Sequence, residues 1–246
     1  MGAIAIIPAR YASTRLPGKP LLARTGKPLI QHVVEAVLKA RSIESIVVAT
    51  DDERIVRAVT GFGAEVVMTS PDCRSGTDRL AEAADKLALA DSAMVVNVQG
   101  DEPEMPPECI DTLVGLLEHT DADMATLATP LEQARVADPN RVKVVLDRRG
   151  YAMYFSRSAI PFDRDGTGDV RRLLHLGIYA YRVGFLTRYA ALEPTAAERA
   201  EKLEQLRALE HGYRIAVGVV EHYAVGIDTP ADYEAFVKRQ AAAGKT

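Results

Sequence analysis

Cysteine and long apolar runs are scarce in this chain. Two cysteines, Cys73 and Cys109, occur among its 246 residues. Two thiols exclude a disulfide scaffold or a cysteine-based zinc site, and they fit a reducing compartment. No apolar run approaches the roughly 18 residues that a membrane span needs, and the first ten residues have no basic segment of a secretory signal. We therefore expect a soluble, cytoplasmic protein with no membrane partner.

Acidic residues are absent from the beginning of the chain. The net charge of the whole chain is −4, yet the segment before Glu35 holds five basic residues and no acidic one. That segment is therefore +5 and the rest of the chain −9. A cationic loop on an acidic protein predicts a local anion site rather than a face that binds nucleic acid. A solvated basic loop is the alternative interpretation.

The overall composition is that of a globular protein. Hydrophobic residues make up 48% of the chain and charged residues 26%, which excludes disorder, collagen and coiled coil. A chain of this length buries a large core without the help of disulfides or metals. We expect one domain over residues 1–246, with halves at about 1–120 and 121–246.

The hydrophobic pattern changes along the chain. In the first half, helical patterns separate four short strands, expected at 3–7, 45–50, 65–69 and 93–98. Strands that alternate with helices indicate a parallel sheet with right-handed crossovers. After a helix at 107–117, strands are expected without helices between them, at 124–129, 142–147, 151–155 and 174–181. Three helical patterns follow, interrupted by a strand at 214–219 and ending at 232–243.

These elements predict an α/β fold. We expect a Rossmann-like, mostly parallel sheet sandwiched by helices, with an antiparallel extension in the second half. Residues 163–172, where Asp, Arg and Gly alternate, are expected to form an exposed loop.

The loop after the first strand carries the clearest chemical signal. It runs from Pro8 to Pro20 and lies at the carboxyl end of a strand, where open parallel sheets bind ligands. Backbone amides around Ala12, Ser13 and Gly18 and the side chains of Arg10, Arg15 and Lys19 are suited to surround a polyphosphate. The loop has neither the glycine spacing of a Walker loop nor that of a dinucleotide fingerprint.

Two acidic motifs are candidates for a metal site. Asp101 follows the fourth strand, where a carboxylate beside a phosphate loop suits Mg²⁺. The alternative is that Asp101 and Glu102 cap the next helix. Asp228, before the last helix, would supply a second carboxylate, but it is equally suited to a helix cap, and sequence spacing cannot place it near Asp101.

A third motif, Cys73 to Arg79, opens a helix. Thr77 or Asp78 is expected to cap that helix. Arg74 precedes the cap and is placed to hydrogen-bond a base or ribose.

Six motifs in order resemble one enzyme family over residues 3–235. The chain is similar to the 3-deoxy-D-manno-octulosonate (KDO) cytidylyltransferases, also called CMP-KDO synthetases, of the nucleotide-diphospho-sugar transferase type. The motifs that carry the resemblance are IPARYASTRLPGKPL, RSGTDR, NVQGDEP, HLGIYAYR, LEQLRALEHG and VGIDTP.

The resemblance implies an activity and a set of nucleotide residues. Members transfer CMP from CTP to the anomeric hydroxyl of KDO for lipopolysaccharide synthesis, release pyrophosphate and are commonly homodimers. By this likeness, Arg10, Lys19, Asp101 and Asp228 are catalytic, and Asp101 and Asp228 hold the Mg²⁺ cofactor. The implied CTP-binding residues are Pro8, Ala9, Arg10, Ser13, Arg15, Lys19, Arg74, Ser75, Gly76 and Asp78.

The resemblance also implies a sugar site. Arg157 matches the position that faces the sugar carboxylate, which a guanidinium fork suits. The other implied sugar residues are Gln99, His175, Tyr179, Glu204 and Gln205. As alternatives, His175 and Tyr179 share one strand face and are simply half-buried, and Glu204 and Gln205 are exposed helix positions. A metal-ligand role for His175 is disfavoured because no second histidine lies at ligand spacing.

Two other functions stay open on the sequence alone. One is cytidylyl transfer to a related acid, 8-amino-KDO or sialic acid. The other is a sugar-nucleotide-binding protein without turnover, which would have no need to keep both metal carboxylates.

Overall fold

One mixed sheet runs through the chain, and it contains nine strands within the residues that the structure describes. The computed structural model describes residues 2–12, 16–73, 75–168, 170–221, 223 and 226–243. The strand order is β3-β2-β1-β4-β8-β5-β9, and β6 and β7 are attached beside β8. The strands are β1 (Ala3–Ala9), β2 (Ile43–Thr50), β3 (Glu65–Met68), β4 (Met94–Asn97), β5 (Met124–Pro130), β6 (Lys143–Leu146), β7 (Ala152–Ser156), β8 (Leu173–Arg182) and β9 (Ile215–Val219).

The sheet is parallel in its first half and mixed in its second. β1 pairs in parallel with both β2 and β4, and β3 pairs in parallel with β2. β8 then lies antiparallel between β4 and β5, and β6 and β7 continue antiparallel from it. The mostly parallel sheet with an antiparallel extension is therefore confirmed. The division into halves at residue 120 stays a prediction.

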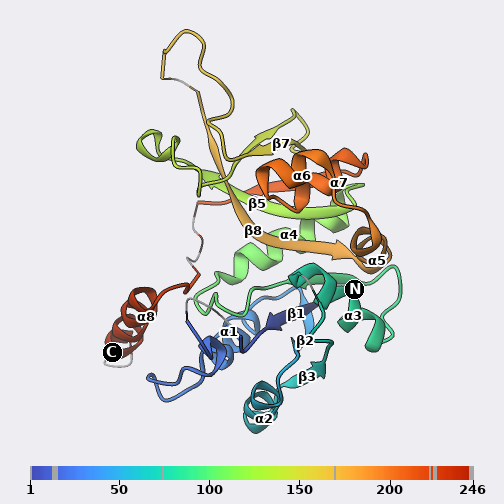
Figure 1. Cartoon of the computed structure of the whole chain (residues 1–246), viewed down its shortest axis with the longest axis vertical. Helices are drawn as coiled ribbons and strands as arrows, with labels where there is room; N and C mark the ends of the chain where they lie inside the picture. The colour runs from blue at the N-terminus through green and yellow to red at the C-terminus, as the bar shows by residue number, and fades with distance from the viewer. Residues whose placement is uncertain are drawn as a thin grey trace.

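Helices cover both faces of this sheet (Figure 1). One face packs against the apolar sides of α1 (Leu29–Val37), α2 (Glu53–Gly61) and α4 (Pro107–His119). The other face is covered by α3 (Gly76–Lys86), α5 (Val183–Ala191), α6 (Ala196–Glu201) and α7 (Gln205–Glu210). Two single turns, η1 (Lys19–Leu21) and η2 (Gln133–Arg135), lie in the loops after β1 and β5. In the described part of the chain four helices follow β8, where the sequence pattern indicated three.

The last helix, α8 (Pro230–Ala243), lies apart from the sheet, at the lower left of Figure 1. Tyr233 and Phe236 of this helix pack with Ile227 and with Leu29 of α1 in a small separate core. This packing places the segment before α8 beside the loop that follows β1, although Lys19 and Ile227 are 208 residues apart in sequence.

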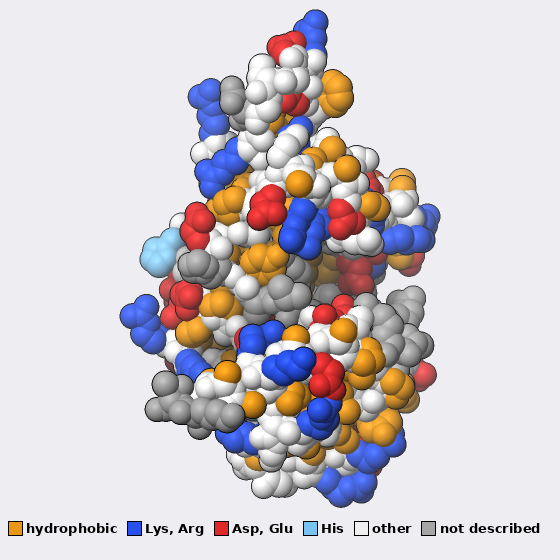
Figure 2. Space-filling model, turned by 90° about the vertical axis from the view of Figure 1, so that its left-hand side faces the viewer, with side chains coloured by type: hydrophobic (Ala, Val, Ile, Leu, Met, Phe, Trp, Pro, Cys, Tyr) orange, Lys and Arg blue, Asp and Glu red, His pale blue; other side chains and the backbone are white. Residues whose placement is uncertain are grey.

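An arm between β7 and β8 projects from the top of the molecule (Figures 1 and 2). Residues 164–168 of this arm are exposed, as expected for the loop, and Phe162 is 83% exposed. Arg172 at its base is buried instead, and its guanidinium donates to Gln133 Oε1. On the face shown in Figure 2, basic and acidic side chains of the described residues lie among one another. No helix within the described ranges has the length and apolar character to span a bilayer.

Candidate active site

The carboxyl ends of β1 and β4 bring the predicted phosphate loop and the first acidic motif together. The backbone turns tightly there, because a side chain on Gly100 would place its Cβ 2.8 Å from the Pro8 carbonyl oxygen. Arg10, just after β1, donates from Nη2 to the Cys73 carbonyl oxygen at 2.6 Å. This bond ties the loop after β1 to the segment that leads into α3.

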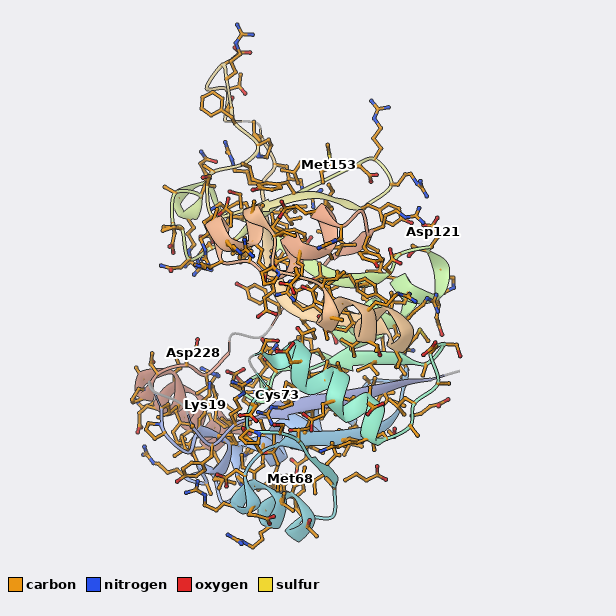
Figure 3. The ribbon with its side chains drawn as sticks, turned by 45° about the vertical axis from the view of Figure 1, so that its right-hand side comes forward. Lys19, Met68, Cys73, Asp121, Met153 and Asp228 are labelled. Carbon is orange, nitrogen blue, oxygen red and sulfur yellow. The ribbon has the colours of Figure 1, made fainter. Side chains whose placement is uncertain are left out.

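Lys19 lies at the centre of this edge. Its Nζ donates to Asp101 Oδ2 at 2.6 Å, to the Ile227 carbonyl oxygen at 2.8 Å and to Asp228 Oδ1 at 3.5 Å. Figure 3 shows Lys19 and Asp228 on the same side of the molecule, near Cys73. Gly18 precedes Lys19 with a φ of +66°, which turns the chain so that η1 can start. Three of the four predicted catalytic groups therefore meet, although 82 and 209 residues separate Lys19 from the two carboxylates.

Neither carboxylate is a helix cap. The residue that caps α4 is Pro106, five residues after Asp101. At the start of α8 the amides of Asp228 and Thr229 both donate to Asp232 Oδ2, so Asp232 closes that turn. The capping alternatives for Asp101 and Asp228 are therefore wrong, and both carboxylates remain directed at Lys19.

Glu102 adds a third carboxyl group to this region. Its Oε2 is buried and has no hydrogen-bond partner within the described residues. Burial, together with the negative charges of Asp101 and Asp228, raises the pKa of Glu102 to about 8. Below that pH Glu102 is therefore mostly protonated, and the Lys19 ammonium faces the two carboxylates of Asp101 and Asp228.

The donor set fits a magnesium ion. Mg²⁺ is usually bound by one or two carboxylates, with water and substrate phosphates completing its octahedron. Asp101 and Asp228 already share one cation, the Lys19 ammonium, so they lie close enough to share another. The described residues contain no cluster of three or more His, Cys, Asp and Glu side chains suited to a metal. A metal ion bound to Asp101 and Asp228 would therefore need further ligands, such as water and the phosphate oxygens of a substrate.

The start of α3 supplies the next wall. Ser75, not Thr77 or Asp78, is the cap: its hydroxyl accepts from the Asp78 amide at 3.1 Å, and Asp78 Oδ2 accepts from the Ser75 amide at 3.2 Å. The expected caps were wrong because this reciprocal box fixes the helix start at Gly76. A Cβ on Gly76 would lie 4.0 Å from Pro8 Cγ, so this wall adjoins the loop after β1. The predictions for Ser13, Arg15 and Arg74 lie outside the described residues.

A cavity of about 250 Å³ opens beside these groups, on the face covered by α3 and α7. It brings together four of the six predicted sugar residues, Gln99, Tyr179, Glu204 and Gln205. Glu204 is exposed at the rim, where its Oε2 accepts from Thr77 Oγ1 at 3.3 Å. Gln205 is only 4% exposed, so the interpretation as an exposed helix position is wrong for Gln205.

The other two predicted sugar residues do not line this cavity. His175 lies among Phe155 and Tyr179, with ring centroids at 4.8 and 5.5 Å, and its Nε2 is 3.1 Å from Thr126 Oγ1. Burial lowers the pKa of His175 to about 3, which keeps the ring neutral. Arg157 donates from Nε to the Glu201 carbonyl at 2.7 Å and from Nη1 to the Pro139 carbonyl at 2.9 Å. Its guanidinium thus holds β7 against the end of α6.

Sequence reasoning missed four residues that line the cavity: Thr77 as a lining residue, Asn97, Lys202 and Leu203. Asn97 is the last residue of β4 and Gln99 lies beyond the strand, so strand alternation does not relate the two, and no sequence pattern marks Asn97 as a lining residue. Lys202 has a left-handed backbone with a φ of +54°, which no sequence pattern announces.

A larger cavity of about 590 Å³ adjoins the acidic cluster. Glu102, Asp228 and His175 contribute to its lining, together with Arg135 and Arg141. Most of its remaining wall is apolar, with Met105, Leu127 and Ile178 among the lining residues.

Comparison with known proteins identifies the class to which this geometry belongs. The family model described as cytidylyltransferase matches residues 4–215, and the chain belongs to this family. It is 51% identical to the 3-deoxy-manno-octulosonate cytidylyltransferase of Vibrio campbellii, over 96% of this chain and 98% of the relative. The resemblance inferred from the six motifs is therefore confirmed.

Two further comparisons refine this assignment. The chain is 49% identical to the 8-amino-3,8-dideoxy-manno-octulosonate cytidylyltransferase of Shewanella putrefaciens, over 98% of this chain and 100% of the relative. The solved structure of a CMP:2-keto-3-deoxy-manno-octonic acid synthetase complexed with CTP superimposes with a TM-score of 0.92 and 44% identity, over 98% of this chain and 99% of that one.

Proposed function

We propose that this protein transfers CMP from CTP to the anomeric hydroxyl of 3-deoxy-D-manno-octulosonate and releases pyrophosphate. The observation that carries the proposal is the cluster of Lys19, Asp101 and Asp228 at the carboxyl edge of the sheet, in a chain of the cytidylyltransferase family. A lysine and two carboxylates beside a basic loop suit a reaction in which a hydroxyl attacks a triphosphate.

The residues of the chain act mainly by position and charge. Lys19 faces the triphosphate and stabilises the negative charge that develops on the departing pyrophosphate. Arg10 donates a hydrogen bond to the segment before α3. This bond fixes the distance between the loop after β1 and the start of α3, the two sides of the proposed nucleotide site. The cavity between α3 and α7 lies on the same edge and holds the sugar, with its anomeric hydroxyl toward Asp101.

We also propose that Asp101 and Asp228 hold Mg²⁺ together with phosphate oxygens of CTP. When bound, the ion neutralises phosphate charge and lowers the pKa of the attacking hydroxyl. Asp101→Asn and Asp228→Asn keep the side-chain size and remove the charge. Each should lower kcat by orders of magnitude and weaken binding of Mn²⁺ with CTP, as measured by electron paramagnetic resonance. Near-normal kcat and Mn²⁺ binding in either variant would remove that carboxylate from the site.

Release of pyrophosphate tests the activity directly. The assay offers CTP, UTP, ATP and GTP in turn with KDO, 8-amino-KDO and sialic acid, with and without Mg²⁺. We expect turnover with CTP and KDO that requires the metal. Faster turnover with 8-amino-KDO would reassign the sugar, as the similarity to the Shewanella relative allows. Binding of CTP without turnover of any sugar acid would support a non-catalytic binding protein instead.

We further propose that the protein works as a homodimer. Support comes from large apolar side chains that its own fold leaves in solvent: Met153 and Tyr154 on β7 are 63% and 39% exposed, and Phe162 is 83% exposed on the arm. The cytoplasmic location expected from the sequence stays a prediction.

A further inference from the structure

Two residues that line the 250 Å³ cavity each have a buried polar atom without a hydrogen-bond partner in the part of the chain that the structure describes. The atoms are Oδ1 of Asn97, at the end of β4, and Nε2 of Gln205, the first residue of α7. Asn97 is 3% exposed and Gln205 is 4% exposed, and both line the cavity. Buried polar groups are almost always hydrogen-bonded, since each unpaired one costs free energy. Two in one cavity indicate that a ligand supplies the missing partner.

The two atoms ask for complementary partners. Asn97 Oδ1 accepts a hydrogen bond, whereas Gln205 Nε2 donates one. Because neither has a partner, they are not bonded to one another. A hydroxyl group can donate to the first and accept from the second. An ammonium group has no lone pair for Gln205, and a carboxylate has no proton for Asn97.

Both groups are held by rigid elements. Asn97 pairs with Tyr179 across β4 and β8, in the interior of the sheet. Gln205 follows Glu204, whose carbonyl oxygen accepts from Tyr189 Oη at 2.6 Å and whose carboxylate accepts from Thr77. Recognition groups on such supports keep their positions while a ligand enters.

We propose that Asn97 and Gln205 together bind one hydroxyl group of the sugar acid and select a hydroxyl at that position over hydrogen or an amine. The inference rests on the proposed function. It adds Asn97 as a specificity-determining residue and states the kind of group that the pair recognises.

Two near-isosteric variants separate recognition from structure. Asn97→Leu and Gln205→Met replace each amide by an apolar group of similar size. If the amides were merely unpaired, the variants would be as stable as the wild type or more so, with unchanged kinetics. We expect instead that kcat/KM for the sugar acid falls about ten- to a hundredfold, with KM for CTP unchanged and no loss of thermal stability. Asn140→Leu makes the same change at an exposed residue of the 590 Å³ cavity and should leave every parameter unchanged.

Sugar analogues identify the partner. The series contains KDO analogues in which one hydroxyl at a time is replaced by hydrogen. For each position it also contains the analogue in which that hydroxyl is replaced by an amine. In the wild type, one deoxy analogue and its amine should each lose at least about tenfold in kcat/KM. In the Asn97→Leu variant, kcat/KM for that deoxy analogue should be nearly the same as kcat/KM for KDO. The variant has already lost the oxygen that accepts from this hydroxyl, so removing the hydroxyl costs little more.

The outcomes separate this inference from the proposed function. Absence of turnover with CTP and every sugar acid would overturn the proposed function. Turnover with unchanged kcat/KM in both variants would overturn only the role of Asn97 and Gln205. If a variant fails to fold, the analogue series is measured with the wild-type protein alone. Equal kcat/KM values for all deoxy analogues would then contradict the inference.

Discussion

At the scale of single residues, Arg157 has a structural role beside the sugar contact that the family resemblance predicts for it. Its guanidinium donates to the carbonyl oxygens of Glu201 and Pro139. Glu201 is the last residue of α6 and directly precedes Lys202, which lines the 250 Å³ cavity. Because Arg157 holds the Glu201 carbonyl, it also fixes the position of Lys202 in the cavity wall. This structural role is compatible with the predicted contact between Arg157 and the sugar carboxylate.

We predict that Arg157→Ala lowers the melting temperature and raises KM for the sugar acid. A bidentate charged contact is worth about 1.5–3 kcal/mol, which corresponds to a factor of about ten to over a hundred in KM. Arg157→Lys should recover only part of this factor, because a point charge lacks the planar fork. Steady-state kinetics with each substrate varied checks the assignment. A change in KM for CTP alone would show that Arg157 serves the nucleotide site.

The two thiols are expected to react slowly. Burial and the hydrogen bond to Glu82 raise the pKa of Cys73 to about 11, and burial raises the pKa of Cys109 to about 11. A raised pKa means that the thiolate, the reactive form, is scarce below that pH. At pH 8 we predict alkylation of Cys73 at well under a tenth of the rate of free cysteine. Glu82→Gln removes the carboxylate and should speed the reaction, as mass spectrometry can follow. Rapid labelling of Cys73 in the native protein would contradict this account.

At the scale of elements, a buried arginine on α3 connects this helix to the carboxyl ends of β2 and β3. Arg79 on α3 is fully buried, donates from Nη1 to Thr69 Oγ1 and forms an ion pair with Asp51 at 2.7 Å. These partners follow β3 and β2, so one side chain joins three elements.

We predict that Arg79→Leu destabilises the protein by about 3 kcal/mol or more, because loss of one partner leaves the other charge unpaired. Arg41→Leu is the control: Arg41 is 92% exposed beside Asp111, and an exposed pair contributes about 1 kcal/mol at most. Urea unfolding of both variants gives the comparison. Equal stabilities would mean that the buried pair contributes no more than the surface pair.

Local sequence patterns predict where the strands lie in the chain better than they predict which strands pair with each other. Every strand that the sequence indicated occurs within two residues of its expected limits, because apolar runs and turn residues mark strands locally. The position of β8 between β4 and β5 is set by pairing across distant segments, to which no local pattern refers. The cap of α3 was misplaced by two or three residues because Ser, Thr and Asp, all good caps, follow one another there.

At the scale of the whole molecule, the fold creates the acidic cluster by bringing the loop after β1 beside the end of β4 and the segment before α8. Sequence chemistry identified Lys19, Asp101 and Asp228 as groups that suit phosphate and magnesium. The packing of α8 on α1 and the hydrogen bond from the Ile227 amide to the Asp101 carbonyl oxygen, which bring Asp228 to Lys19, follow from the fold. The 250 Å³ cavity likewise depends on the fold, because its lining comes from β4, β8 and the start of α7. Asn97 escaped notice because a buried, unpaired amide is visible only in three dimensions.

Assembly is the prediction that belongs to this scale. If the arm and β7 form the dimer contact, Phe162→Ser should shift the protein from dimer toward monomer, since it removes a large apolar surface. Light scattering after size exclusion measures the mass. Leu38→Ser is the control, a similar change at a side chain that is 67% exposed on the distant end of α1. A wild-type monomer, or a dimer that Phe162→Ser leaves intact, would contradict the proposed interface.

In the proposed reaction CTP is cleaved at its α-phosphorus by a sugar acid rather than by water. Phosphorus-31 magnetic resonance follows that bond directly in a mixture of enzyme, CTP, KDO and Mg²⁺. The account predicts that the triphosphate signals give way to equal amounts of one phosphodiester and pyrophosphate, and that no change occurs without KDO. Formation of CMP and pyrophosphate at the same rate without KDO would show that the site is a nucleotide hydrolase and would contradict the account.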